Sequence, residues 1–92
     1  MKLEKDIEKS VKAYARTKGF LAFKFVSPGH NFVPDGLFIS PTGKVFFIEF
    51  KREGGKPTSG QLREHVRIRA NGVEVFVVDN VEQGKGIVDE NT

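Results

Sequence analysis

The chain has 92 residues, a length that points to one small domain. It contains no Cys, which excludes disulfides and thiolate metal ligands, and no apolar run approaches the roughly 20 residues that cross a bilayer. The formal net charge of +3 suits a phosphate-backbone partner, although a plain soluble surface explains it equally well.

The N-terminal segment predicts an amphipathic helix over about residues 2–18. Leu3, Ile7, Val11 and Tyr14 recur at helical spacing, and Gly19 follows the last turn. The segment is charged and does not resemble a signal peptide. We therefore expect a soluble, cytoplasmic protein without a membrane partner.

Three strand patterns follow the first helix. They cover Phe20–Val26, Asp35–Ser40 and Lys44–Arg52. The Pro, Gly and Asn of residues 27–32 indicate a loop between the first two strands, and the SPTG of residues 40–43 indicates a turn between the second and third.

A second helix is predicted over about residues 58–71, after the flexible connector EGGKP. Thr58 or Ser59 can cap its start, and Gly72 stands just past its end. The residues expected on its core side are Leu62, Val66 and Ala70.

The C-terminal part contains one more strand pattern, the apolar run of residues 73–78. Residues 81–92 are polar and Gly-interrupted, so we expect a tail that frays. The predicted fold is a single α/β domain over residues 1–92 with a core at about 3–80. Its order is α-β-β-β-α-β, with a mixed central sheet flanked by helices, because the last helix connects two parallel strands.

Two carboxylates interrupt the otherwise apolar hairpin. Because side chains alternate along a strand, Glu49 and Lys51 share one face. If the turn is centred on Thr42, Asp35 lies opposite Glu49 with Cβ atoms about 4.5–5.5 Å apart, which is destabilising for like charges. We therefore predict a divalent cation, Mg²⁺ with Mn²⁺ as a substitute, bound by both carboxylates and the main-chain carbonyl of Phe50.

Each half of this pattern also has an ordinary structural explanation. A Glu-x-Lys on a strand is usually a solvated edge, and Pro-Asp commonly begins a turn. We favour the metal site because both elements occur together on facing strands of one hairpin.

These residues resemble the PD-(D/E)xK nuclease superfamily, with Pro34-Asp35 and Glu49-Phe50-Lys51 as its motifs. More narrowly, the chain is similar to a stand-alone VRR-NUC domain of the phage type over roughly residues 4–80. One departure is Phe32, which stands three residues before Asp35, where many relatives have Gly. The further matching stretches are ExxIExxV (Glu4–Val11), SPG (Ser27–Gly29), FIEFKREGG (Phe47–Gly55) and Gln61.

The resemblance implies a restriction-endonuclease-like core and a Mg²⁺-dependent endonuclease that acts on DNA. Asp35 and Glu49 would be metal ligands, and Lys51 would stabilise negative charge on the phosphate. Glu4 would approach the metal directly or through water, with Glu8 as the alternative. Gln61 would hydrogen-bond to substrate or water, although a solvent-facing Gln is the plain alternative.

We also expect DNA contacts from basic and polar residues around the site, and these contacts would read shape and not sequence. His65, one turn after Gln61, could touch a phosphate, but a solvated or partly packed side chain is the expectation. Stand-alone relatives suggest a homodimer that cuts branched DNA such as four-way (Holliday) junctions. The expected DNA-binding residues are Lys24, His30, Asn31, Arg52, Lys56, Arg63 and Arg67.

Other functions stay open at this point. A non-catalytic nucleic-acid-binding module on the same fold would bind DNA in a salt-sensitive way without cutting it. A restriction-type or mismatch-type endonuclease has little room for a recognition subdomain in 92 residues. A structural or assembly protein is the remaining alternative, and it leaves the facing carboxylates unexplained.

Overall fold

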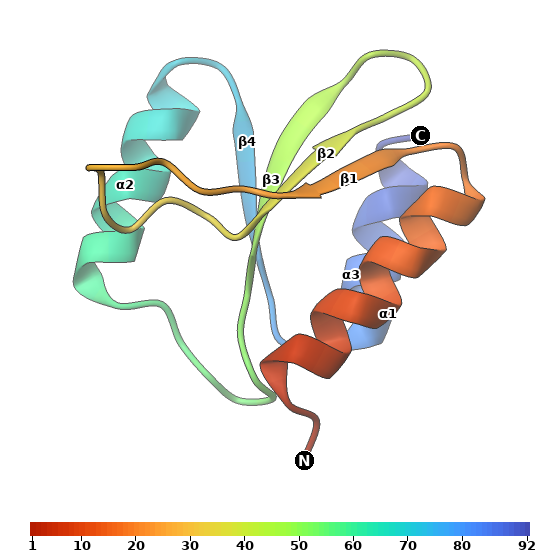
Figure 1. The fold of residues 1–92 in the computed structure, drawn as a ribbon, viewed down its shortest axis with the longest axis horizontal. Coiled ribbons are helices and arrows are strands. Elements are labelled where there is room, and N and C mark those ends of the chain that lie inside the picture. Colours follow the sequence, from red (N-terminus) through yellow and green to blue (C-terminus); the bar gives the residue numbers. More distant parts are fainter.

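Seven helices and strands form the fold in the computed structural model, which describes all residues from Met1 to Thr92 (Figure 1). The first six follow the predicted order α-β-β-β-α-β, and the α/β class is confirmed. No helix combines the length and apolar character needed to cross a membrane. In chain order the elements are α1 (Glu4–Thr17), β1 (Leu21–Lys24), β2 (Gly36–Ile39), β3 (Val45–Phe50), α2 (Ser59–Ala70), β4 (Glu74–Val78) and α3 (Val81–Glu90).

The four strands form one mixed sheet in the order β1-β2-β3-β4. β1, β2 and β3 are antiparallel neighbours, whereas β4 runs parallel to β3, as expected for a crossover through α2. All four strands are shorter than their predicted spans, because the outer residues of each pattern belong to the segments that connect the elements.

The register of the β2–β3 hairpin confirms the prediction on which the site depends. Gly36 pairs with Ile48 and Ile39 pairs with Val45, so the hairpin is symmetric about Thr42. One further step along this register places Asp35 opposite Glu49.

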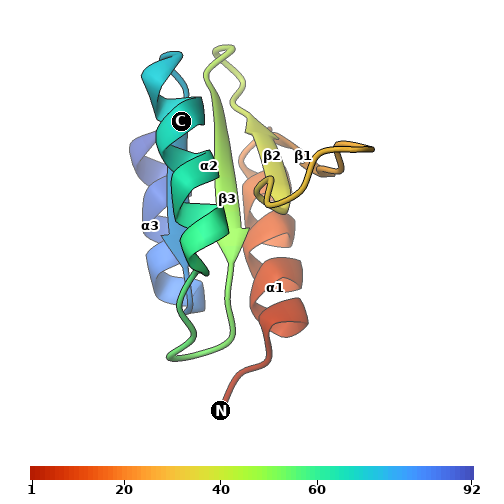
Figure 2. The same cartoon turned by 90° about the vertical axis from the view of Figure 1, so that its left-hand side faces the viewer.

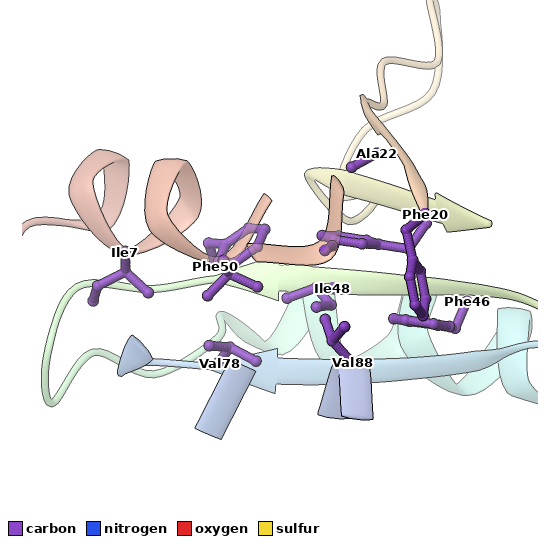
Figure 3. Close-up of a cluster of buried hydrophobic side chains, with 11 residues drawn as sticks. Ile7, Phe20, Ala22, Phe46, Ile48, Phe50, Val78 and Val88 are labelled. Carbon is purple, nitrogen blue, oxygen red and sulfur yellow. The ribbon is translucent and has the colours of Figure 1, made fainter. Parts of the chain in front are cut away.

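The hydrophobic core lies between the sheet and the α1–α3 pair. Phe46, Ile48 and Phe50 of β3 are completely buried and face Ile7 of α1 and Val88 of α3 (Figure 3). Phe46 also stacks on Phe38 with ring centroids 5.4 Å apart and meets Phe20 and Phe76 edge-on. The Phe-rich composition is therefore used mainly to fill one layer of this small domain.

The helix α2 lies on the other side of the sheet from α1 and α3 (Figures 1 and 2). The prediction that Leu62, Val66 and Ala70 form its core side was wrong, because all three are exposed. Gly60 and His65 are its buried residues instead. Its inner surface faces the polar end of β3, so the apolar positions of the sequence do not mark the packed face.

The C-terminal residues form α3 and not a fraying tail. Gly84 lies against Val11 of α1 so closely that a Cβ on Gly84 would stand 2.4 Å from a Val11 methyl carbon. Tyr14 of α1 donates a hydrogen bond of 2.7 Å to Asp89 of α3. The glycine that suggested a break in the sequence is therefore the residue that lets the two helices approach.

Candidate active site

Asp35 and Glu49 meet at the end of the β2–β3 hairpin. The main-chain N–H of Phe50 donates a hydrogen bond of 3.1 Å to Oδ2 of Asp35, which fixes that carboxylate beside β3. Glu49 is only 1% exposed. Burial raises the pKa of Glu49 to about 8, together with the hydrogen bond that protonated Glu49 donates to Asp35 and the negative charge of Asp35. Without a cation, the acidic pair therefore holds a proton at neutral pH.

Lys51 brings positive charge to the same place. It lies two residues after Glu49 on the same face of the chain, and its own N–H donates to the carbonyl of Val78 on β4 at 2.8 Å. Its charge opposes the rise in the pKa of Glu49. The half-buried Lys51 side chain is therefore a cation held next to the two carboxylates.

The first turn of α2 aims Gln61 at the site. Thr58 and Gln61 form a capping box, in which the Thr58 hydroxyl accepts from the Gln61 N–H and the Thr58 N–H donates 2.9 Å to Oε1 of Gln61. With its oxygen engaged, the Gln61 amide must turn its NH₂ group the other way. That group donates to Oε2 of Glu49 at 3.5 Å, so the helix cap orients a hydrogen-bond donor toward the carboxylates.

Glu4 and Glu8 of α1 are in different electrostatic surroundings. Burial raises the pKa of Glu4, and the negative charge of Asp35 raises it further, while Lys51 opposes the rise. Glu8 instead accepts a hydrogen bond of 2.6 Å from the buried Lys12 one turn along the helix. Of the two, Glu4 is the carboxylate whose charge interacts with those of Asp35 and Glu49.

Comparisons with known proteins identify the family. No family model matches the sequence. The chain is 49% identical over 77 residues to "Putative nuclease p44" of Acyrthosiphon pisum secondary endosymbiont phage 1, covering 84% of this chain and 83% of that protein. A solved structure described as "VRR_NUC domain" matches with a TM-score of 0.88 and 36% identity over 97% of both chains. The chain belongs to the VRR-NUC family.

This VRR-NUC domain buries one histidine at the site, and the sequence pattern did not predict its position there. His65 is 0% exposed, and its Nε2 lies 3.3 Å from Oε1 of Glu49. Its Nδ1 has no hydrogen-bond partner. Burial lowers the pKa of His65, which favours the neutral ring, and one hydrogen bond joins its Nε2 to the carboxyl group of Glu49. The expectation of a solvated or partly packed ring was therefore wrong, although the spacing of four residues from Gln61 places both on one helix face.

The carboxylate and carbonyl oxygens of the VRR-NUC site are of the ligand type that a hard cation prefers. The crowding of Asp35 and Glu49 is relieved when a positive ion replaces their shared proton. No group of three His, Asp or Glu side chains forms a ready-made metal cluster in the structure. A bound ion would therefore need the carbonyl of Phe50 and water to complete its coordination.

The structure separates the seven residues expected to contact DNA into three groups. Lys24 lies close enough to Glu4 for its charge to oppose the rise in the pKa of that carboxyl. His30, Asn31, Arg63 and Arg67 line one cavity of about 380 Å³ between the β1–β2 loop and α2. The third group is on the connector after β3, where Arg52 donates to the carbonyl of Glu53 and Lys56 lies near Asp79.

Proposed function

We propose that this VRR-NUC protein is a metal-dependent endonuclease that hydrolyses phosphodiester bonds in DNA. The observation that carries the proposal is the buried acidic pair of Asp35 and Glu49, whose charges are tolerated together only when a cation or a proton is present. A phosphate group brought to such a cation would be the natural substrate. The phage relative that bears the name of a nuclease supports this reading.

Asp35, Glu49 and the main-chain carbonyl of Phe50 would hold Mg²⁺ or Mn²⁺, with Glu4 joining them directly or through a water. Oxygen ligands of this kind suit both ions. When bound, such an ion polarises the phosphate and makes a water molecule more acidic.

The other site residues act on charge and orientation. Lys51 would stabilise the negative charge that develops on the phosphate, because an ammonium fixed beside the reacting group needs no reorganisation. Gln61 offers an amide donor whose direction is set by the helix cap. His65 contacts Glu49 from the buried side and would orient this carboxylate for a bound ion.

The proposed substrate is branched DNA, such as a four-way junction, and the proposed enzyme is a homodimer. One site cuts one strand, so symmetric cleavage of two strands calls for two sites related by a two-fold axis. The exposed Leu21, Phe23 and Val45 lie on the sheet face that also carries Glu49, and they support a second copy packing against β1 and β2. Light scattering tests this: wild type should have the mass of a dimer, and Phe23→Lys should give a monomer.

Cleavage of single-stranded, duplex, flapped and four-way DNA with Mg²⁺ or Mn²⁺ tests the activity. Asp35→Asn, Glu49→Gln and Lys51→Ala should each lower the rate by at least 100-fold, which is the size of effect expected for removed electrostatic stabilisation. Equal cutting by wild type and variants would mean that the activity is a contaminant. Salt-sensitive DNA binding without any metal-dependent cutting would instead identify a binding module.

Glu4 and Glu8 provide a matched pair for the same assay. Glu4→Gln should slow cleavage and raise the Mg²⁺ concentration that gives half the maximal rate. Glu8→Gln removes the same charge from the same helix but only breaks the ion pair with Lys12. If both variants behave alike, Glu4 does not belong to the metal site.

A further inference from the structure

The backbone at Phe32 is held in a conformation that disfavours its side chain. With φ at 71°, Phe32 is the one residue other than glycine that lies in the left-handed region. A Cβ and a large ring make this region unfavourable, whereas glycine would adopt it without strain. The chain therefore keeps an aromatic ring where the backbone alone would select Gly, and such strain is concentrated at functional sites.

The ring of Phe32 lies flat on Gly60 at the start of α2. A Cβ built on Gly60 would stand 2.9, 2.9 and 3.0 Å from three adjacent ring carbons of Phe32. An edge-on ring would give clearly unequal distances, so one face of the ring covers Gly60. Phe32 is nevertheless 51% exposed, which leaves the opposite face open to solvent.

The open ring stands among groups that suit a nucleic-acid backbone. Phe32 lines the cavity of about 380 Å³ between the β1–β2 loop and α2, and it is the one hydrophobic residue of the seven that do so. Glu64 pairs with both His30 and Arg67 at 3.0 Å. Arg63, on the same helix, makes no ion pair or side-chain hydrogen bond and so remains available for a phosphate. The loop that carries the ring projects beside α2 and leads directly to Asp35 (Figures 1 and 2).

We propose that Phe32 is a stacking platform for one unpaired base of the DNA substrate, with Arg63 contacting the adjoining phosphate. This inference rests on the proposed nuclease function. A ring supported on one side and open on the other offers the flat apolar surface on which a base stacks. A protein partner would be expected to need more apolar surface than this single ring among charged side chains provides.

The platform also gives a physical reason for preferring branched DNA over duplex. In an intact duplex both faces of each base are already stacked, whereas flaps and junctions present bases that can leave the stack at little cost. The site would therefore stabilise complexes with branch points and contribute little to duplex binding. The ring would act as a specificity determinant three residues away from the metal ligand Asp35.

Tryptophan fluorescence tests the contact directly, because the sequence contains no Trp. Phe32→Trp introduces a single reporter at the platform, and Val66→Trp introduces one at an exposed position of α2 outside the lining of the cavity. Without Mg²⁺, so that the strand stays whole, a flapped DNA should quench the Phe32→Trp emission at least twofold and leave Val66→Trp almost unchanged. Equal quenching of both reporters, or of neither, overturns the platform.

Binding of Phe32→Gly separates the platform from the nuclease activity. Glycine suits the left-handed backbone, so the free energy of unfolding of the variant should be no lower than that of wild type. It should bind flapped and four-way DNA about tenfold more weakly, which is the size of one base–aromatic stack, and duplex unchanged. If Phe32→Gly prefers branched DNA as strongly as wild type does, the platform is overturned, even if the variant cleaves DNA normally. If Phe32→Trp shows the quenching but neither it nor wild type ever cuts DNA, the platform stands and the nuclease proposal fails.

Discussion

The protonation of Glu49 makes the stability of the metal-free protein depend on pH in an unusual direction. The pKa of this carboxyl is about 8 in the folded protein and has an ordinary value of 4.5. Between those values the folded state keeps a proton that the unfolded state has released, so stability falls as pH rises. From pH 6.5 to pH 8 the loss is about 1.5–2 kcal/mol, since one unit of pH corresponds to roughly 1.4 kcal/mol.

Urea unfolding in EDTA at pH 6.5 and pH 8 measures this loss. Glu49→Gln mimics the protonated carboxyl, so the variant should lose about 1.5–2 kcal/mol less than wild type over the same range. His65 should not obscure the difference, because the unfolded ring binds protons near pH 6.5 that the folded ring does not, and this effect is the same in wild type and variant. Saturating Mg²⁺ should remove the wild-type trend, because the cation replaces the proton. Equal losses in wild type and variant would refute the crowded acidic pair.

Two further changes test other contacts of the structure. His65→Ala removes the hydrogen bond to Glu49, so the Mg²⁺ concentration for half-maximal cleavage should rise at least about tenfold. If this variant is less stable but has the same metal dependence as wild type, the His65 ring serves only packing. Gly84→Ala forces a methyl against Val11 and should lower the free energy of unfolding by about 1–3 kcal/mol. Gly86→Ala on the same helix meets no neighbour and should instead stabilise by roughly 0.5–1 kcal/mol, so a similar loss in both variants would contradict the close helix crossing.

The hairpin could be predicted because its information is local. Alternating side chains assign Glu49 and Lys51 to one face, and counting outward from Thr42 gives the partner of Glu49. A wrong register would have separated the carboxylates, so the agreement depends on the turn that SPTG forms. The acidic pair of the site was therefore accessible from the sequence.

The two failures at α2 and α3 have tertiary causes. Leu62 and Val66 have helical spacing, but the surface that α2 faces is polar, so Gln61 and His65 point inward instead. Gly84 indicates a break in an isolated helix, and only the approach of Val11 makes its missing side chain an advantage. Neither partner surface can be read from the segment that packs on it.

The pairing of α1 with α3 also affects the order in which parts of the fold can form during synthesis. The residues proposed to bind the metal or assist the reaction all lie before residue 66, while Val88 and the rest of α3 are translated later. A chain emerging from the ribosome therefore contains every residue proposed for catalysis before the α1–α3 layer can form. The packing of α1, with Glu4 in its first turn, is therefore complete only after α3 has been made.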